Sequence, residues 1–233
     1  MSRAAISVDR LLLARVTFPH WHPRVSEGGC DVFGYAVSHP DGIILFDTGV
    51  GIDNPLIEEL YHPTFTPINE ALAAVHLDIN GVVAVVNSHL HFDHCGQNKM
   101  LLDHGVPTYV QAVEVTTACT EAHYTVPEWA SIPSEMLRLV RGDEQLTAGV
   151  RIIETPGHTP GHQSLVVETA TGRTVIAGQC IYDLRECNSR AVALDNMHNA
   201  AALEAGQASL ERILALSPCT IVAAHDSGAC AIA

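Results

Sequence analysis

A ten-residue stretch with the sequence NSHLHFDHCG concentrates the side chains best suited to chemistry in this chain. Its three histidines and one aspartate, His89, His91, Asp93 and His94, directly follow the apolar run 82–86, which predicts a buried strand. Imidazole and carboxylate groups are ligands that zinc accepts. His89 and His91 can share one face, whereas Asp93 and His94 come after the bend and can turn toward a second point. The stretch therefore predicts a loop that serves two metal ions.

Polar side chains also follow four other apolar segments that predict strands. The side chains are Asp47, His158, Gln179 and His225, and the segments are 43–47, 150–154, 174–177 and 220–224. If these strands share a sheet, their ends meet at one edge and the polar groups converge there. The last segment is predicted to be the final strand of the chain. The sequence thus predicts a metal site assembled from several strand ends.

The remaining pattern alternates strands and helices, which predicts an α/β chain. Segments 30–38 and 43–47 flank the turn sequence HPDG and predict an antiparallel hairpin, and segments 163–168 and 174–177 predict another. Helices are predicted at 67–76, 98–103 and 199–216, with one more inside the mixed segment 112–133. No linker interrupts the pattern, so residues 1–233 are predicted to form a single domain.

Composition narrows the classes of partner and the compartment. The chain has 26 acidic and 12 basic residues, a net charge of −14, which disfavours nucleic acid and anionic membrane surfaces as partners. The longest apolar runs are too short for a membrane span or a signal-peptide core. Seven scattered cysteines favour a reduced protein over a disulfide framework, so we expect a cytoplasmic location.

The string SHLHFDHCGQN resembles the HxHxDH signature of the metallo-β-lactamase superfamily, and it looks most like the N-acyl-homoserine lactonase branch. This resemblance implies an αββα sandwich in which two mixed sheets pack between helices, with the site along one edge of both sheets. It also implies one or two Zn²⁺ ions, a small lactone or ester substrate and a role in quorum quenching. A homodimer is one candidate for the oligomeric state.

The resemblance also implies a role for each matching residue. His89, His91 and His158, the last within TPGHTPGH, match the ligands of a first metal, and Asp93, His94 and His225 match those of a second. Asp47 in FDTG matches an acid that supports the ligands by accepting a hydrogen bond. Tyr182 matches a tyrosine that points at the substrate carbonyl. His162, the second histidine of TPGHTPGH, is assigned a structural role.

One position departs from the family pattern. The family usually has a metal-bridging aspartate after the strand equivalent to 174–177, and this chain has Gln179 followed by Cys180. A neutral amide leaves one more positive charge unneutralised, so the second ion should be held more weakly, whereas a Cys180 thiolate would restore the charge. Adjacent residues of an extended chain face opposite ways, so only one of the two should face the metals. Two alternatives follow. The site is binuclear with an unusual ligand, or it holds one ion tightly and one loosely.

The implied activity is metal-dependent opening of a lactone ring by water that the metal activates. Asp93 would orient that water and carry a proton, and Tyr182 would donate a hydrogen bond to the developing oxyanion. Segment 112–133, with Trp129, is interpreted as a wall over an acyl chain. His20 and His22 are predicted to share a strand face and are interpreted as ordinary edge residues, with a place at the pocket mouth as the alternative.

Three alternatives remain open at this point. A hydrolase of the same fold that acts on a thioester or another ester would use the same residues. A mononuclear iron oxygenase of the persulfide-oxidising type also resembles the signature. A non-catalytic binding module is the third alternative, because Gln179 replaces the usual acid.

Overall fold

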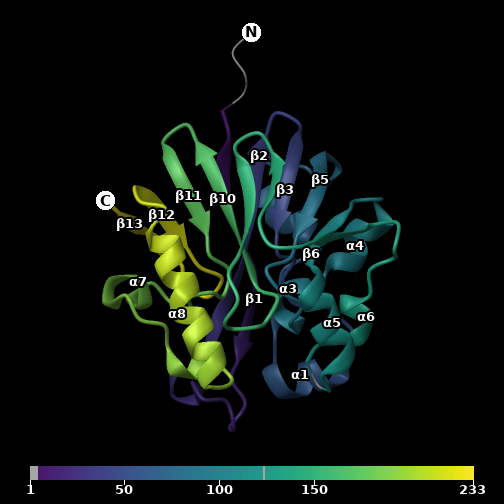
Figure 1. Cartoon of the computed structure of the whole chain (residues 1–233). Helices are drawn as coiled ribbons and strands as arrows, with labels where there is room; N and C mark the ends of the chain where they lie inside the picture. The colour runs from purple at the N-terminus through teal and green to yellow at the C-terminus, as the bar shows by residue number, and fades with distance from the viewer. Residues whose placement is uncertain (1–4, 123) are drawn as a thin grey trace.

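A computed structural model describes residues 5–122 and 124–233 and has two β-sheets that pack face to face between helices (Figure 1). The first sheet has the strand order β4-β1-β2-β3-β5-β6-β7 and the second has the order β13-β12-β11-β10-β9-β8. Each sheet mixes parallel and antiparallel pairs. The predicted αββα sandwich with two mixed sheets is confirmed.

The first sheet joins an antiparallel meander to a parallel half. Its strands are β1 (Ser7–Thr17), β2 (Gly29–His39), β3 (Gly42–Phe46), β4 (Thr64–Phe65), β5 (Val82–Val86), β6 (Thr108–Gln111) and β7 (Leu137–Val140). The predicted hairpin is β2 and β3, which pair in register from His39 opposite Gly42. Strand β1 was not predicted. Its burial alternates along the strand, since Leu11 and Leu13 are at most 1% exposed whereas Leu12 is 48% exposed, as in a strand with one solvated face.

The second sheet carries the C-terminal half of the chain. Its strands are β8 (Glu144–Thr147), β9 (Val150–Glu154), β10 (Gln163–Thr169), β11 (Gly172–Ile176), β12 (Cys219–Val222) and β13 (Cys230–Ile232). The prediction that segment 220–224 is the final strand is wrong, because β13 returns antiparallel to β12 and forms the sheet edge. That short strand carries Cys230, Ala231 and Ile232, which are too few for a periodic pattern.

Helices cover both outer faces of the sandwich. They are α1 (Pro55–Tyr61), α2 (Ile68–Ala74), α3 (Phe92–Cys95), α4 (Asn98–Asp103), α5 (Ala112–Thr120), α6 (Pro127–Ala130), α7 (Arg185–Ser189) and α8 (Ala200–Leu214), with 3₁₀ turns at Val25–Glu27, Ile79–Gly81 and Leu194–Asn196. Helices α7 and α8 lie beside the second sheet, and α1 and α3 to α6 lie on the other side (Figure 1). Helix α8 is capped by Asn199, whose side chain accepts from the Ala202 N–H, and it buries Leu210 and Ile213 on the sheet.

The core between the sheets holds their strand ends together. Phe33, Tyr35 and Phe46 of the first sheet pack against Ile152 and Leu165 of the second. The Tyr35 hydroxyl donates to the Ala223 carbonyl at 2.7 Å, and the Phe33 N–H donates to the Ala224 carbonyl at 2.8 Å. These bonds join β2 to the segment that follows β12, so the ends of strands from both sheets lie side by side.

Two further features concern the cysteines and the helices. All seven cysteines are free thiols. Across the described ranges, none of the helices combines the length and apolarity needed to cross a membrane.

Candidate metal centre

The predicted polar side chains come from the ends of strands in both sheets. Asp47 follows β3, and His89 lies in the loop after β5 in the first sheet. His158, Gln179 and His225 follow β9, β11 and β12 in the second sheet. The premise that these strands share one sheet is therefore wrong. The side chains converge because the two sheets face each other and their corresponding edges adjoin.

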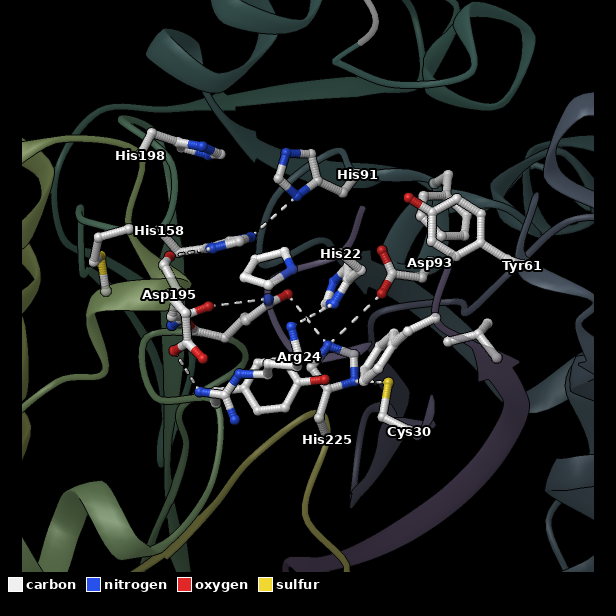
Figure 2. Close-up of a pocket in the computed structure, with 18 of the residues that line it drawn as sticks. His22, Arg24, Cys30, Tyr61, His91, Asp93, His158, Asp195, His198 and His225 are labelled. Carbon is white, nitrogen blue, oxygen red and sulfur yellow. Dashed lines mark hydrogen bonds and ion pairs between the residues drawn. The ribbon is translucent and has the colours of Figure 1, made fainter. Parts of the chain in front are cut away.

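Three histidines form one compact group, called here the first donor cluster: His89, His91 and His158. The His91 Nδ1 lies 3.0 Å from the His89 Nε2. It also lies 3.1 Å from the His158 Nε2 (Figure 2). Burial, reinforced by the neighbouring imidazoles, holds the pKa of His89 and of His91 well below the usual value, and burial lowers the pKa of His158 to about 3. The cluster therefore presents neutral imidazoles, the form that binds a metal.

A second group, the second donor cluster, consists of Asp93, His94 and His225. The Asp93 Oδ2 lies 3.6 Å from the His94 Nε2 and 3.7 Å from the His225 Nε2. Burial lowers the pKa of His94, but the carboxylates of Asp93 and Asp47 outweigh it, and the net shift is upward. This cluster differs from the first in carrying a negative charge.

Gln179 faces the second donor cluster and Cys180 does not. The Gln179 Oε1 lies 3.1 Å from the His94 Nε2 and 3.2 Å from the His225 Nε2. Cys180 is 1% exposed and packs with the apolar residues beneath α8, and burial raises the pKa of its thiol. Gly178 makes the turn at φ +60°, where a Cβ would lie only 2.9 Å from the His162 Nε2.

Each of four histidines has its outer ring nitrogen bound to an oxygen. The His94 Nδ1 lies 2.8 Å from an Asp47 carboxylate oxygen, and the His89 Nδ1 lies 2.9 Å from the Ser88 hydroxyl. The His158 Nδ1 donates to the Asn196 carbonyl at 2.9 Å, and the His225 Nδ1 donates to the Asp31 carbonyl at 3.0 Å. Because the proton sits on the outer nitrogen, the Nε2 lone pair of each ring points into the site.

Asp47 is placed by a strained turn at the end of β3. Its φ is +62°, a left-handed value uncommon outside glycine, and such strain often occurs at functional sites. Its carboxylate accepts from the Ser88 N–H and hydroxyl, each at 2.7 Å, as well as from His94. The next residue, Thr48, donates its N–H to the His94 carbonyl at 2.8 Å. The FDTG turn thus orients the histidine loop through both side chain and backbone.

Glu114 of α5 supports the first donor cluster from beneath. It is fully buried, and burial raises the pKa of its carboxyl group despite several hydrogen bonds. Its carboxylate accepts from the Leu90 N–H at 2.8 Å, from the Thr159 hydroxyl at 2.8 Å and from the Tyr124 hydroxyl. Leu90 lies between His89 and His91, and Thr159 follows His158. One carboxylate therefore joins the two loops that carry the cluster.

A cavity of about 520 Å³ opens directly onto both donor clusters. His91, His158, Asp93 and His225 lie around it in Figure 2, with His198 at its rim. Much of the remaining wall is aromatic, formed by Phe18, Trp21, Tyr61, Phe92 and Tyr182. The site therefore combines a polar floor that can hold cations with an apolar wall.

Tyr182 forms part of the wall beside the second donor cluster. The Tyr182 ring stacks on the His225 ring with centroids 4.9 Å apart. The Arg24 guanidinium lies 3.8 Å from the centroid of the Tyr182 ring. Burial, followed by the neighbouring Cys30 thiol, raises the pKa of its hydroxyl group. Within the part of the chain that the structure describes, the buried hydroxyl oxygen has no hydrogen-bond partner.

Two expectations about the pocket are wrong in detail. His20 and His22 lie in turns after β1 and do not share a strand face, although His22 lines the cavity. Trp129 of α6 packs against Gly51 and the core and is absent from the cavity wall, whereas Tyr124 from the same predicted segment lines it.

His162 bonds through both ring nitrogens, to Thr155 and to the Gln179 N–H.

Several residues at the site were missed in the sequence. Four of them, Ser88, Asn196, Arg24 and Cys30, contact a predicted site residue, and Glu114 bonds Leu90 and Thr159 beside the predicted ligands. Ser88 directly precedes His89 in the sequence, and this position could have identified it as a site residue. The other four lie far from it in the chain, and their types are common on any surface. Only the fold reveals them.

The donor set fits a metal ion. The two clusters contain five imidazoles and one carboxylate, and the ligand atoms within each cluster all lie within 4.8 Å of one another. Such nitrogen and oxygen donors suit zinc and related divalent ions. The first donor cluster would hold one ion, and the second donor cluster with Gln179 would hold another.

The fold and these two donor clusters define an αββα architecture with a candidate binuclear metal site at the edge of its sheets. The family model of the metallo-β-lactamase superfamily matches residues 28–225, and the chain belongs to that superfamily.

Relatives within the family include N-acyl homoserine lactonases. The chain is 31% identical over 157 residues to the enzyme of a Bacillus species and to AiiA of Bacillus thuringiensis subsp. kurstaki. The match covers 62% of this chain and 61% of each relative. A hydroxyacylglutathione hydrolase of a Synechococcus strain is 28% identical over 120 residues, covering 49% of this chain and 42% of that protein.

Solved structures show the same fold. A variant of Bacillus thuringiensis AiiA with N-decanoyl-L-homoserine bound superimposes with a TM-score of 0.75 at 23% identity, over 97% of this chain and 95% of that one. AidC, a dizinc quorum-quenching lactonase, superimposes with a TM-score of 0.72 at 14% identity, over 97% and 91% of the two chains.

Proposed function

We propose that this protein is a metal-dependent lactonase that opens N-acyl-homoserine lactones and thereby quenches quorum signals. The observation that carries the proposal is the pair of donor clusters on the floor of one cavity with an aromatic wall. Similarity to the Bacillus lactonases supports the substrate class. The cofactor we propose is Zn²⁺, at one or two ions per chain.

The reaction needs a nucleophile beside a polarised ring carbonyl. A bound divalent ion lowers the pKa of water and polarises a carbonyl. Asp93 of the second donor cluster lies on the cavity wall, where its carboxylate can hold the attacking water and carry its proton to the leaving ring oxygen. The product is the opened N-acyl-homoserine, a hydroxy acid.

Tyr182 is the proposed donor to the oxygen of the ring carbonyl. Its hydroxyl has no partner among the described residues and keeps its proton, because burial raises its pKa. The stack on His225 and the cation over its ring hold the side chain in place. A preorganised donor of this kind contributes about 2.7–4 kcal/mol to the transition state.

The aromatic wall suits an apolar acyl chain. Trp21 and Tyr61 meet edge to face at 6.3 Å, and Tyr61 packs on Phe92 at 4.5 Å beside Asp93. An acyl chain against this wall would leave water, which favours binding by about 25 cal/mol per Å² of buried apolar surface. We therefore expect affinity to rise with acyl length until the cavity is filled. The seven free thiols support a reducing compartment, and we propose the cytoplasm.

The test is ring opening measured by proton release. Zn²⁺-loaded protein is mixed with N-hexanoyl- and N-decanoyl-homoserine lactone, and chelator-treated protein serves as the control. We expect turnover that the chelator abolishes and added Zn²⁺ restores, with the decanoyl substrate preferred. A glutathione thioester tested in parallel covers the activity named for the Synechococcus relative.

Two outcomes would overturn the proposal. Fully loaded protein that opens neither lactone but cleaves the thioester would make it a thioester hydrolase. Tightly bound iron with oxygen consumption in the presence of a persulfide would make it an oxygenase.

A further inference from the structure

The side chain of Gln179 is held in one orientation by Asn196. The Asn196 Nδ2 donates to the Gln179 backbone carbonyl at 3.0 Å, and the Gln179 Nε2 donates to the Asn196 Oδ1 at 3.1 Å. Both residues are buried, at 8% and 3% exposure. The two amides therefore form a closed pair at the floor of the cavity.

The direction of this pair follows from its backbone member. A backbone carbonyl can only accept a hydrogen bond, so the amide nitrogen of Asn196 must face it. The Asn196 oxygen must then face Gln179, and this requires the Gln179 amide nitrogen on that side. The Gln179 oxygen is left pointing at His94 and His225. The positions of the oxygen and nitrogen of the Gln179 side-chain amide are thus fixed by its hydrogen bonds.

Several lone pairs consequently meet in the second donor cluster. The Nδ1 atoms of His94 and His225 donate to Asp47 and Asp31, so their Nε2 lone pairs face the Gln179 oxygen at 3.1 and 3.2 Å. The Asp93 carboxylate adds a further acceptor. Only a cation, a proton or a metal ion, satisfies such a group. The arrangement makes Gln179 a neutral oxygen ligand.

Asn196 also contacts the first donor cluster, but through a different atom. Its backbone carbonyl accepts from the His158 Nδ1 at 2.9 Å. A change of its side chain therefore leaves that contact in place. This separation allows the two clusters to be perturbed independently at a single residue.

We propose that Asn196 is a positioning residue that turns Gln179 into the neutral fourth ligand of the second donor cluster, so that the two clusters load metal in separate steps, the second weaker. The inference rests on the proposed metal-dependent function. An oxygen without charge attracts a cation less than a carboxylate would, and the second donor cluster then has Asp93 as its single anionic ligand.

The experiment is a titration of metal-free protein with Zn²⁺ in competition with a chromogenic chelator, followed by Co²⁺ absorption spectra. In the wild type we expect two steps of different affinity. Gln179→Leu and Asn196→Leu should weaken the second step at least tenfold and change the first less than twofold. Gln179→Glu should tighten the second step at least tenfold.

Two variants separate positioning from loosening of the loop. Asn196→Asp keeps an oxygen to accept from the Gln179 amide but loses the donor to the Gln179 backbone carbonyl, so its second step should weaken less than that of Asn196→Leu. Gln207→Leu removes the side-chain bonds to the Val192 N–H and the Arg190 carbonyl that tie down the same loop far from the metals. Both of its steps should match the wild type.

The proposal is wrong if Gln179→Leu or Asn196→Leu retains a wild-type second step, or if Gln207→Leu weakens that step as much as they do. If Asn196→Leu fails to fold, the Gln179→Leu and Gln179→Glu pair decides the question. Because the readout is metal binding, a protein that opens no lactone but shows these steps would overturn the proposed function and leave this inference standing.

Discussion

The two donor clusters use different means to gather ligands. The first consists of three neutral imidazoles whose nitrogens lie 3.0–3.1 Å apart, and it is joined from beneath by one buried carboxylate, Glu114. The second contains a carboxylate, is more open at 3.6–3.7 Å, and is supported by Asp47 and completed by a neutral amide. The first cluster relies on prearranged geometry, and the second relies on charge. The predictions below test this contrast.

The largest effect should come from deleting a ligand of the first donor cluster. In His91→Ala the tight ion should be lost and lactone turnover should fall roughly a thousandfold, because carbonyl polarisation contributes several kcal/mol. In His225→Ala the tight ion should remain. Metal content by mass spectrometry and proton-release rates measure both. Equal loss of both ions from both variants would show that the clusters bind as one unit.

Asp47→Asn should weaken the second donor cluster more than the first, because Asp47 bonds His94 directly and reaches His89 only through Ser88. The neutral amide accepts poorly from the His94 Nδ1 and frees the ring to flip its proton, which costs about 10–100-fold in metal affinity. Zn²⁺ titration measures the effect. Asp103→Asn, which changes an exposed acid paired with Lys99, is the matched control and should bind as the wild type does. A first step that weakens as much as the second in Asp47→Asn would contradict the separation of the clusters.

Glu114→Gln should act on the first cluster. An amide keeps one acceptor oxygen but places a donor against the Leu90 N–H or the Thr159 hydroxyl, at a cost of about 1.5–3 kcal/mol in stability. We expect the first metal step to weaken about tenfold and the second to stay unchanged. Denaturant unfolding and Zn²⁺ titration measure the two effects. Glu121→Gln, an exposed change at the end of the same helix, should leave both intact.

Acid should destabilise the metal-free protein through the first cluster. Burial lowers the pKa of His158 from 6.5 to about 3, so between these values the unfolded chain binds a proton that the folded chain does not. Stability from such a group is present above pH 6.5 and is lost as the pH falls, by about 1.4 kcal/mol per pH unit.

His94 has the opposite sign, because its pKa is raised and its contribution is lost as the pH rises. Denaturant unfolding of chelator-treated wild type and His158→Gln at pH 7 and pH 5 measures the difference. The variant should lose less stability on acidification. Identical slopes for the two proteins would rule out the neutral-imidazole account.

Much of the fold could be predicted where a periodic pattern is long and uninterrupted. Strands β5 and β9 and helix α4 begin and end at the predicted residues, and helix α8 lies within its predicted range. Strand β1 was missed because the charged residues on its solvated face break the apolar run. Strand β13 is too short to show a period. Local patterns therefore predicted the elements, and failed where an edge strand is polar or brief.

The candidate ligands were visible in the sequence because histidines at two-residue spacing after an apolar strand are rare by chance. The sequence did not show whether Gln179 or Cys180 faces the metals, since alternation on an extended chain allows either one to face inward. The left-handed turn at Gly178 decided it, by directing the amide into the site and the thiol into the core beneath α8.

The sequence by itself determined the superfamily, the residues that form the two clusters and the acidic, cysteine-containing character of the chain. The tertiary structure decided how these residues work together. Two sheets, and not one, bring the strand ends to a common edge. Asp47, Glu114 and Asn196 reach their partners across 47, 24 and 17 residues of chain. Such long-range contacts have no local signature, because only the packing of distant segments places a hydrogen-bond acceptor opposite its donor.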